Sequence, residues 1–117
     1  MAITRIQPGV RYSEAVIAGG FIFCAGMVPN VTTGDIVEQT QDVLAQIDQL
    51  LAECQADKSQ IVDATIYLAD MADYVGMNQA WDQWVAKGHA PARATVEARL
   101  ADPAWRIEIK VTAYHAQ

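Results

Sequence analysis

The spacing of apolar residues along this chain of 117 residues alternates between a period of two and a period near 3.6. A period of two is typical of a β-strand with one buried face, and a period of 3.6 is typical of an amphipathic α-helix. The longest helical run predicts a helix from about residue 36 to residue 55. Its apolar face consists of Val43, Leu44, Ile47, Leu50, Leu51 and Cys54. This alternation predicts an α+β domain, in which helices pack on a sheet.

Strand-like segments precede and follow this helix, at residues 16–17, 21–25, 61–68, 93–100 and 106–114. Ala18-Gly19-Gly20 predicts a tight turn between the first two. A second helix is expected after residues 61–68, with Asp70 or Asp73 as its cap and Lys87-Gly88 at its end. Its buried stripe is expected to contain Tyr74, Met77, Trp81, Trp84 and Val85. The predicted order is ββαβαββ, a single sheet with two helices on one face, in one domain spanning residues 1–117.

Two of the predicted strands are apolar on both faces. Phe21 and Phe23 alternate with Ile22 and Cys24. In the strand at residues 61–68, one face is expected to carry Val62, Ala64, Ile66 and Leu68, and the other Ile61, Thr65 and Tyr67. Because helices on one face leave the other uncovered, these strands predict that a second copy of the chain packs there, in a symmetric homo-oligomer.

Composition argues against several classes of protein. The formal net charge of −6, with scattered basic residues, disfavours a nucleic-acid partner. No apolar run is long enough to span a membrane, and the first ten residues lack the apolar core of a signal peptide. Cys24 and Cys54 both lie among apolar residues and do not indicate a disulfide framework. Together these features predict a cytoplasmic protein.

Two residues of opposite charge stand in the last two predicted strands. Arg93 follows Pro91-Ala92, and Glu108 stands between two isoleucines. On adjacent strands they would form a compact site, because a guanidinium fork suits a carboxylate and a glutamate can hold or deprotonate a water molecule. The alternative is structural, with Arg93 paired to Glu108 or Glu97 on a solvated face.

The segments around Arg93 and Glu108 resemble the C-terminal signature of the RidA/YjgF family of reactive-intermediate (enamine/imine) deaminases, also labelled the endoribonuclease L-PSP family. The similarity is closest to its small YoaB-like branch. Other similar segments follow in order along nearly the whole chain: Arg11-Tyr12-Ser13, Ala25-Gly26, Glu38-Gln39-Thr40, Asp63-Ala64-Thr65, Tyr67-Leu68 and Met77-Asn78. The separation of Arg93 and Glu108 is the specific part of this resemblance, since the other segments are short.

The resemblance implies a chorismate-mutase-like fold that assembles as a homotrimer, with a cleft at each subunit boundary. It also implies a hydrolase similar to 2-iminobutanoate/2-iminopropanoate deaminase. Such an enzyme converts 2-enamine and 2-imine intermediates of amino-acid metabolism to 2-oxo acids and ammonia without a cofactor. In this interpretation Arg93 binds the substrate carboxylate and Glu108 orients the hydrolytic water.

Four further residues correspond to substrate-binding positions of the family. Tyr12 is expected to border the cleft of a neighbouring subunit, Gly26 to let the backbone approach the ligand, and Asn78 to shape the site. Their structural alternatives are a packing residue, a turn glycine and a polar helix residue. Thr95 stands where many relatives carry cysteine, so a backbone contact is possible there but a thiol role is not. Cys24 is expected to be a small core residue rather than a replacement.

Two other functions stay open at this point. A regulatory trimer that binds small carboxylates without turnover is consistent with the threonine at position 95. Endoribonuclease or translation-inhibitor activity, a label that some relatives carry, is disfavoured by the acidic charge and because His89 and His115 lack an evident acid–base partner. Neither histidine stands in a pattern of metal ligands, so no metal site is expected.

Overall fold

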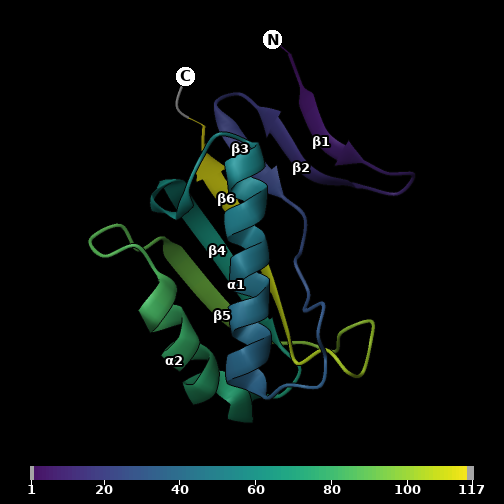
Figure 1. The fold of residues 1–117 in the computed structure, drawn as a ribbon, viewed down its shortest axis with the longest axis vertical. Coiled ribbons are helices and arrows are strands. Elements are labelled where there is room, and N and C mark those ends of the chain that lie inside the picture. Colours follow the sequence, from purple (N-terminus) through teal and green to yellow (C-terminus); the bar gives the residue numbers. More distant parts are fainter. Residues whose placement is uncertain (1, 116–117) are drawn as a thin grey trace.

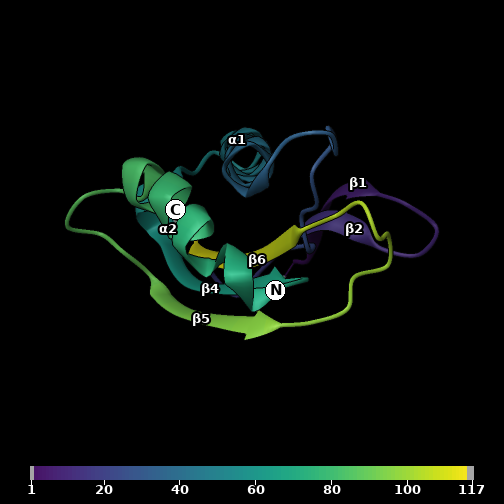
Figure 2. The same cartoon turned by 90° about the horizontal axis from the view of Figure 1, so that it is seen from below.

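The computed structural model describes residues 2–115, which form one six-stranded sheet with two α-helices on one of its faces (Figure 1 and Figure 2). The strands are β1 (Thr4–Pro8), β2 (Ser13–Ala18), β3 (Phe21–Cys24), β4 (Ile61–Leu68), β5 (Ala92–Glu97) and β6 (Ile107–Tyr114). The helices are α1 (Ile36–Glu53) and α2 (Tyr74–Trp84), with 3₁₀ turns at Lys58–Gln60 and Met71–Asp73. The strand order is β1-β2-β3-β6-β4-β5. Neighbouring strands are antiparallel except β4 and β5, which are parallel.

The predicted order ββαβαββ is correct from β2 onward but omits β1. This strand lies at the edge of the sheet and pairs only with β2. Its residues are exposed except Ile6, which is half-buried, so no apolar alternation marks it in the sequence. The strand closes with Pro8, a residue tolerated at a sheet edge because no ladder hydrogen bond is lost there.

Helix α1 begins where local sequence chemistry predicts a helix start. The Asp35 side chain accepts a hydrogen bond from the Glu38 backbone N–H at 2.9 Å, and the Glu38 side chain accepts one from the Asp35 N–H at 3.1 Å. This reciprocal pair is a capping box. The helix ends at Glu53, and Gln55, with a φ of 60°, lies outside it. The predicted helix at about residues 36–55 is therefore confirmed, two residues shorter at its end.

Helix α2 is the crossover that joins the parallel strands β4 and β5, a connection that cannot be a tight hairpin. Asp70 caps the preceding 3₁₀ turn, whereas Asp73 makes no capping hydrogen bond. The helix ends at Trp84, so the predicted end at Lys87-Gly88 is wrong. Within the predicted stripe Met77 and Trp81 are buried, Trp84 and Val85 are half-buried, and Tyr74 is exposed.

The core lies between the helices and the sheet, and its largest fully buried residues include Ile22, Leu44, Ile47, Ile66 and Ile109. In β4, a bulge between Ile61 and Asp63 changes the face on which side chains lie. Ile61 is therefore buried and Val62 is exposed, the reverse of the predicted assignment.

The opposite face of the sheet carries no helix within residues 2–115 (Figure 2). Phe21, Phe23 and Tyr114 lie on it, 39–51% exposed. The Phe21 ring centroid is 6.4 Å from that of Phe23 and 6.1 Å from that of Tyr114. The predicted uncovered apolar face is thus present, and we call these three residues the aromatic patch. Among the described helices, none has the length and apolar character that crossing a membrane requires.

Candidate functional site

Arg93 lies on the edge strand β5 and is held by side chains of α2. It pairs in register with Ala64, a buried residue of the helix-covered face. Its Nη1 donates a hydrogen bond to Asn78 Oδ1 at 2.8 Å, and its Cζ lies 5.3 Å from the centroid of the Trp81 ring. The amide and the indole face therefore orient the guanidinium. The guanidinium makes no ion pair with a described residue, so its charge is available to a carboxylate.

Tyr74 and Met77 complete the surroundings of Arg93. The Tyr74 hydroxyl is 3.5 Å from Nη2, and the Met77 Sδ is 3.9 Å from Nη1. These two residues, together with Asn78 and Trp81, recur every three to four positions along α2, which presents them on one face. That spacing was visible in the sequence, but it predicted a buried stripe rather than a support for Arg93.

Thr95 shares a face with Arg93, because it lies two residues further along β5. It pairs in register with the buried Ile66. Its Oγ1 is buried and has no hydrogen-bond partner among the described residues. A buried hydroxyl without a partner is uncommon and unfavourable. The Thr95 hydroxyl beside Arg93 is thus left without a hydrogen bond by residues 2–115.

Glu108 is the second residue of β6 and points to the face without helices, in register with Tyr67. Gly26 lies against it: a Cβ added to Gly26 would be 2.1 Å from Glu108 Oε2. Met27 then pairs with Ile109 through backbone hydrogen bonds of 2.8 and 3.0 Å. Any side chain at position 26 would displace the carboxylate, which makes no hydrogen bond or ion pair with a described residue.

Tyr12 is joined to the Gly26 region through the backbone. It stands in the loop between β1 and β2 and is 64% exposed. Two residues later, the Glu14 carbonyl accepts a hydrogen bond from the N–H of Ala25, the neighbour of Gly26. A hollow of about 300 Å³ lies beside Tyr12. The predicted site residues thus form two groups, which we call the carboxylate half-site (Tyr12, Gly26 and Glu108) and the arginine half-site (Asn78, Arg93 and Thr95).

The expectation that Arg93 and Glu108 stand on adjacent strands is wrong. β4 lies between β5 and β6, and the pairings of Arg93 with Ala64 and of Glu108 with Tyr67 place the two side chains on opposite faces. The alternative ion pairs are absent as well. Within residues 2–115 the ion pair joins Arg106 to Asp73, and Glu97 instead accepts a hydrogen bond from the Met71 N–H at 3.0 Å.

Cys24 is a buried core residue, as predicted. Burial, reinforced by the nearby Cys54, raises the pKa of its thiol to about 12, although Lys110 opposes this shift. The thiol is therefore protonated at neutral pH and is a poor nucleophile. Among the described residues, no group of three or more His, Cys, Asp or Glu side chains has the proximity that a metal site requires.

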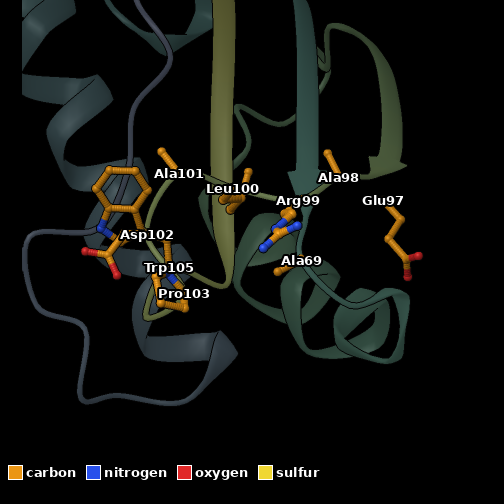
Figure 3. A pocket seen from close by; sticks show the side chains of 9 residues that line it. All are labelled: Ala69, Glu97, Ala98, Arg99, Leu100, Ala101, Asp102, Pro103 and Trp105. Atoms are coloured by element: carbon orange, nitrogen blue, oxygen red, sulfur yellow. The ribbon is translucent and has the colours of Figure 1, made fainter.

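A hollow of about 470 Å³ lies at the loop between β5 and β6, away from both half-sites (Figure 3). Its charged lining residues are Arg99, Glu97 and Asp102, and Figure 3 shows Arg99 beside Ala69 and Leu100. Neither Arg93 nor Glu108 lines it. With two carboxylates and one guanidinium, this hollow does not present the net positive charge that would attract an anion.

The sequence and the fold are both similar to those of known proteins. The sequence model of the Endoribonuclease L-PSP family matches residues 2–115. A RutC family protein of Haemophilus ducreyi is 53% identical over 111 residues, 95% of each chain. RutC family protein YoaB of Escherichia coli is 47% identical over 113 residues, 97% of this chain and 98% of its own. A crystal structure of a YjgF family member from Neisseria meningitidis has a TM-score of 0.97 at 57% identity, covering 100% of this chain and 98% of that one.

Proposed function

Because this chain belongs to the Endoribonuclease L-PSP (RutC/YjgF) family, we propose that it hydrolyses 2-imino acids, and the enamines from which they form, to 2-oxo acids and ammonia. The observation that carries the proposal is that Arg93 and Glu108 are both held in place without forming an ion pair with a described residue. Arg93 is oriented by Asn78 and Trp81 and makes no ion pair within residues 2–115. The Glu108 carboxylate lies against Gly26 and makes no ion pair with any residue from 2 to 115.

The division into two half-sites supports assembly from several copies of the chain, and the family resemblance implies that the assembly is a homotrimer. Arg93 and Glu108 lie on opposite faces, so one chain cannot bring them to the same substrate. The aromatic patch on the helix-free face supplies apolar surface for contact between copies. In the proposed trimer, each cleft receives the carboxylate half-site of one subunit and the arginine half-site of the next. No cofactor takes part in this proposal.

In the proposed mechanism, Arg93 holds the substrate and Glu108 transfers protons. Arg93 binds the carboxylate of the 2-imino acid through two parallel N–H···O hydrogen bonds. Glu108 of the adjacent subunit orients a water molecule and accepts its proton as the oxygen attacks C2, which yields a carbinolamine. Glu108 then gives this proton to the amino nitrogen and takes the proton of the carbinolamine hydroxyl, so that the C=O bond of the 2-oxo acid forms as the C–N bond breaks and ammonia leaves. A protonated imine is already electrophilic, so no nucleophilic side chain is required.

The decisive experiment generates imines in the presence of the purified chain. An amino-acid oxidase or threonine dehydratase produces the imine in place, and its decay is followed continuously with and without the protein. Faster decay supports the proposal. No acceleration across several imines, together with binding of 2-oxobutyrate, would instead indicate a regulatory carboxylate-binding protein. Incubation with single-stranded RNA tests the activity that the family's name describes, and cleavage without imine hydrolysis would overturn the proposal.

A further inference from the structure

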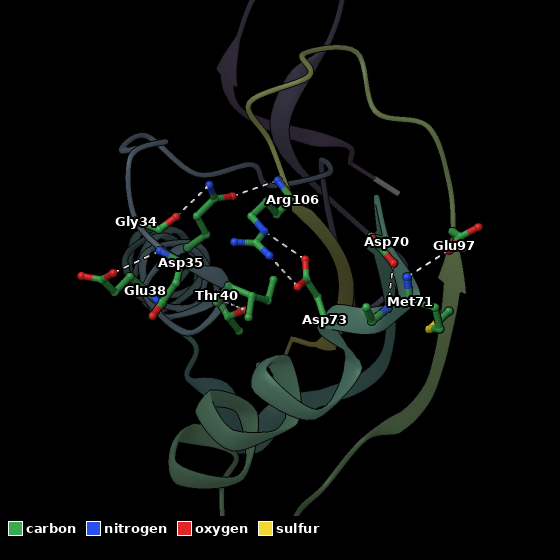
Figure 4. A network of polar contacts seen from close by, with 12 residues as sticks. Gly34, Asp35, Glu38, Thr40, Asp70, Met71, Asp73, Glu97 and Arg106 are labelled. Carbon is green, nitrogen blue, oxygen red and sulfur yellow. Dashed lines mark hydrogen bonds and ion pairs between the residues drawn. The ribbon is translucent and has the colours of Figure 1, made fainter.

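A polar network anchors the loop that leads into β6, just before Glu108. The loop spans residues 98–106, between β5 and β6. The Arg106 guanidinium donates two hydrogen bonds to Asp73, from Nη2 to Oδ1 at 2.7 Å and from Nε to Oδ2 at 3.0 Å. Asp73 is buried and is the N-cap residue of α2 (Figure 4). This bidentate pair therefore fixes the residue that enters β6 to the start of the helix.

Gln39 holds the same loop from the side of α1. It is 1% exposed, and its amide is bonded at both ends. Its Oε1 accepts a hydrogen bond from the Arg106 N–H at 2.9 Å, and its Nε2 donates to the carbonyls of Ala104 at 3.2 Å and Thr32 at 3.1 Å. A buried amide that bonds backbone groups of two loops joins those loops rigidly.

This network lies close to Glu108 along the chain. Arg106 is two residues before Glu108, which stands at the second position of β6. Beyond this end of β6, the Ala69 N–H donates a hydrogen bond to the Arg106 carbonyl at 3.1 Å. Arg93 is held by Asn78 and Trp81, which lie five and eight residues after Asp73 on α2, whereas Gln39 bonds the loop that enters β6 directly.

We propose that Gln39, acting with the Arg106–Asp73 pair, is a positioning residue that sets where the Glu108 carboxylate lies. This inference rests on the proposed function, since it assigns Gln39 a part in orienting the hydrolytic water. Loss of the Gln39 amide lets the first residues of β6 shift, while the carboxylate anchor at Arg93 stays in place. Turnover should therefore fall while ligand affinity is kept. A purely structural role of Gln39 would not separate the two quantities.

The test compares Gln39→Met, which keeps the shape but removes both ends of the amide, with Arg106→Lys, which keeps the charge but loses the paired hydrogen bonds. We expect kcat for imine hydrolysis to fall on the order of tenfold to a hundredfold in both, the scale of a small misplacement of a reacting group. The affinity for 2-oxobutyrate, measured by calorimetry, should stay within about threefold, as for a variant with an intact Arg93 anchor.

The matched control is Thr40→Val, next to Gln39 on α1. The Thr40 hydroxyl is fully buried and donates to the Ile36 carbonyl at 2.7 Å, so its loss costs stability without touching β6. We expect it to lower the melting temperature and leave kcat unchanged. If Gln39→Met does not fold by circular dichroism, Arg106→Lys decides the question.

Unchanged kcat in the folded variants would overturn the positioning role and leave the proposed function intact. Equal losses of kcat and 2-oxobutyrate affinity would also overturn it, because they would show damage to the arginine half-site. A wild-type chain without turnover would overturn the proposed function itself, and the positioning role with it.

Discussion

The side chains of Arg93 and Glu108 point to opposite faces of one sheet, with β4 between the strands that carry them. Arg93 lies under α2, and Glu108 lies on the helix-free face beside Gly26. A reaction that needs both groups therefore needs two copies of the chain.

Arg93→Lys is expected to lose most carboxylate binding although it keeps the charge. A lysine ammonium cannot reproduce the two parallel hydrogen bonds of a guanidinium or its stacking on Trp81. We expect a loss of about 1.5–3 kcal/mol in 2-oxobutyrate binding by calorimetry, the scale of a hydrogen bond to a charged group. Arg99→Lys, in the loop after the same strand, is the control and should bind as the wild type does. Unchanged affinity in Arg93→Lys would make Arg93 a structural residue.

Asn78→Asp should weaken anion binding without removing Arg93. The new carboxylate would stand where Asn78 Oδ1 now accepts a hydrogen bond from Arg93 Nη1 at 2.8 Å. It would form an ion pair with the guanidinium and compete with the ligand carboxylate. We expect 2-oxobutyrate affinity to fall about tenfold or more, the size of one charge-assisted hydrogen bond. Asn78→Ala, which adds no charge, is the comparison, and an equal loss in the two variants would contradict the competition.

Glu108→Gln should separate binding from hydrolysis. The amide has nearly the same size and can hold a water molecule, but it does not accept a proton. Ligand affinity should stay within a few-fold, whereas imine hydrolysis falls by ~10²-fold or more, as loss of a general base typically costs. The coupled imine assay measures this. Wild-type rates in Glu108→Gln would show that the group only orients water or supports the sheet.

Phe23→Glu should dissociate the proposed trimer. Phe23 is 45% exposed in the aromatic patch, and a charge there opposes burial against another copy. Light scattering should give a trimer mass for the wild type and a smaller mass for the variant, with loss of imine hydrolysis. The control is Val75→Glu, since Val75 is exposed on α2, on the other side of the molecule from the aromatic patch. A wild-type monomer at micromolar concentration would refute the trimer.

Cys24 should make stability fall at alkaline pH. Burial raises its pKa from 9.0 to about 12 in the folded chain. Between these values the unfolded thiol loses its proton while the folded one keeps it, so the folded state binds more protons and stability falls as pH rises. The slope from this group is at most about 1.4 kcal/mol per pH unit. Urea unfolding between pH 8 and 10.5 should show a shallower decline for Cys24→Ala than for the wild type, and equal slopes would contradict this.

Much of the fold follows from local patterns. The period of 3.6 and the Asp35–Glu38 capping box define α1, and Ala18-Gly19-Gly20 defines the hairpin between β2 and β3, where both glycines have positive φ. β1 and the exposure of Val62 were not predictable in this way. An exposed edge strand has no apolar alternation, and a bulge arises from pairing with a distant strand.

The sequence by itself determined the helices, the central strands, the family resemblance and the two residue types suited to binding a carboxylate and orienting water. Only the tertiary structure decided which residues meet. β6 pairs with β3 and β4, so Glu108 lies beside Gly26 rather than beside Arg93, and α2 brings Asn78 and Trp81 to Arg93. Strand order and side-chain face depend on long-range pairing and on which face the helices cover, and no local spacing in the sequence encodes either.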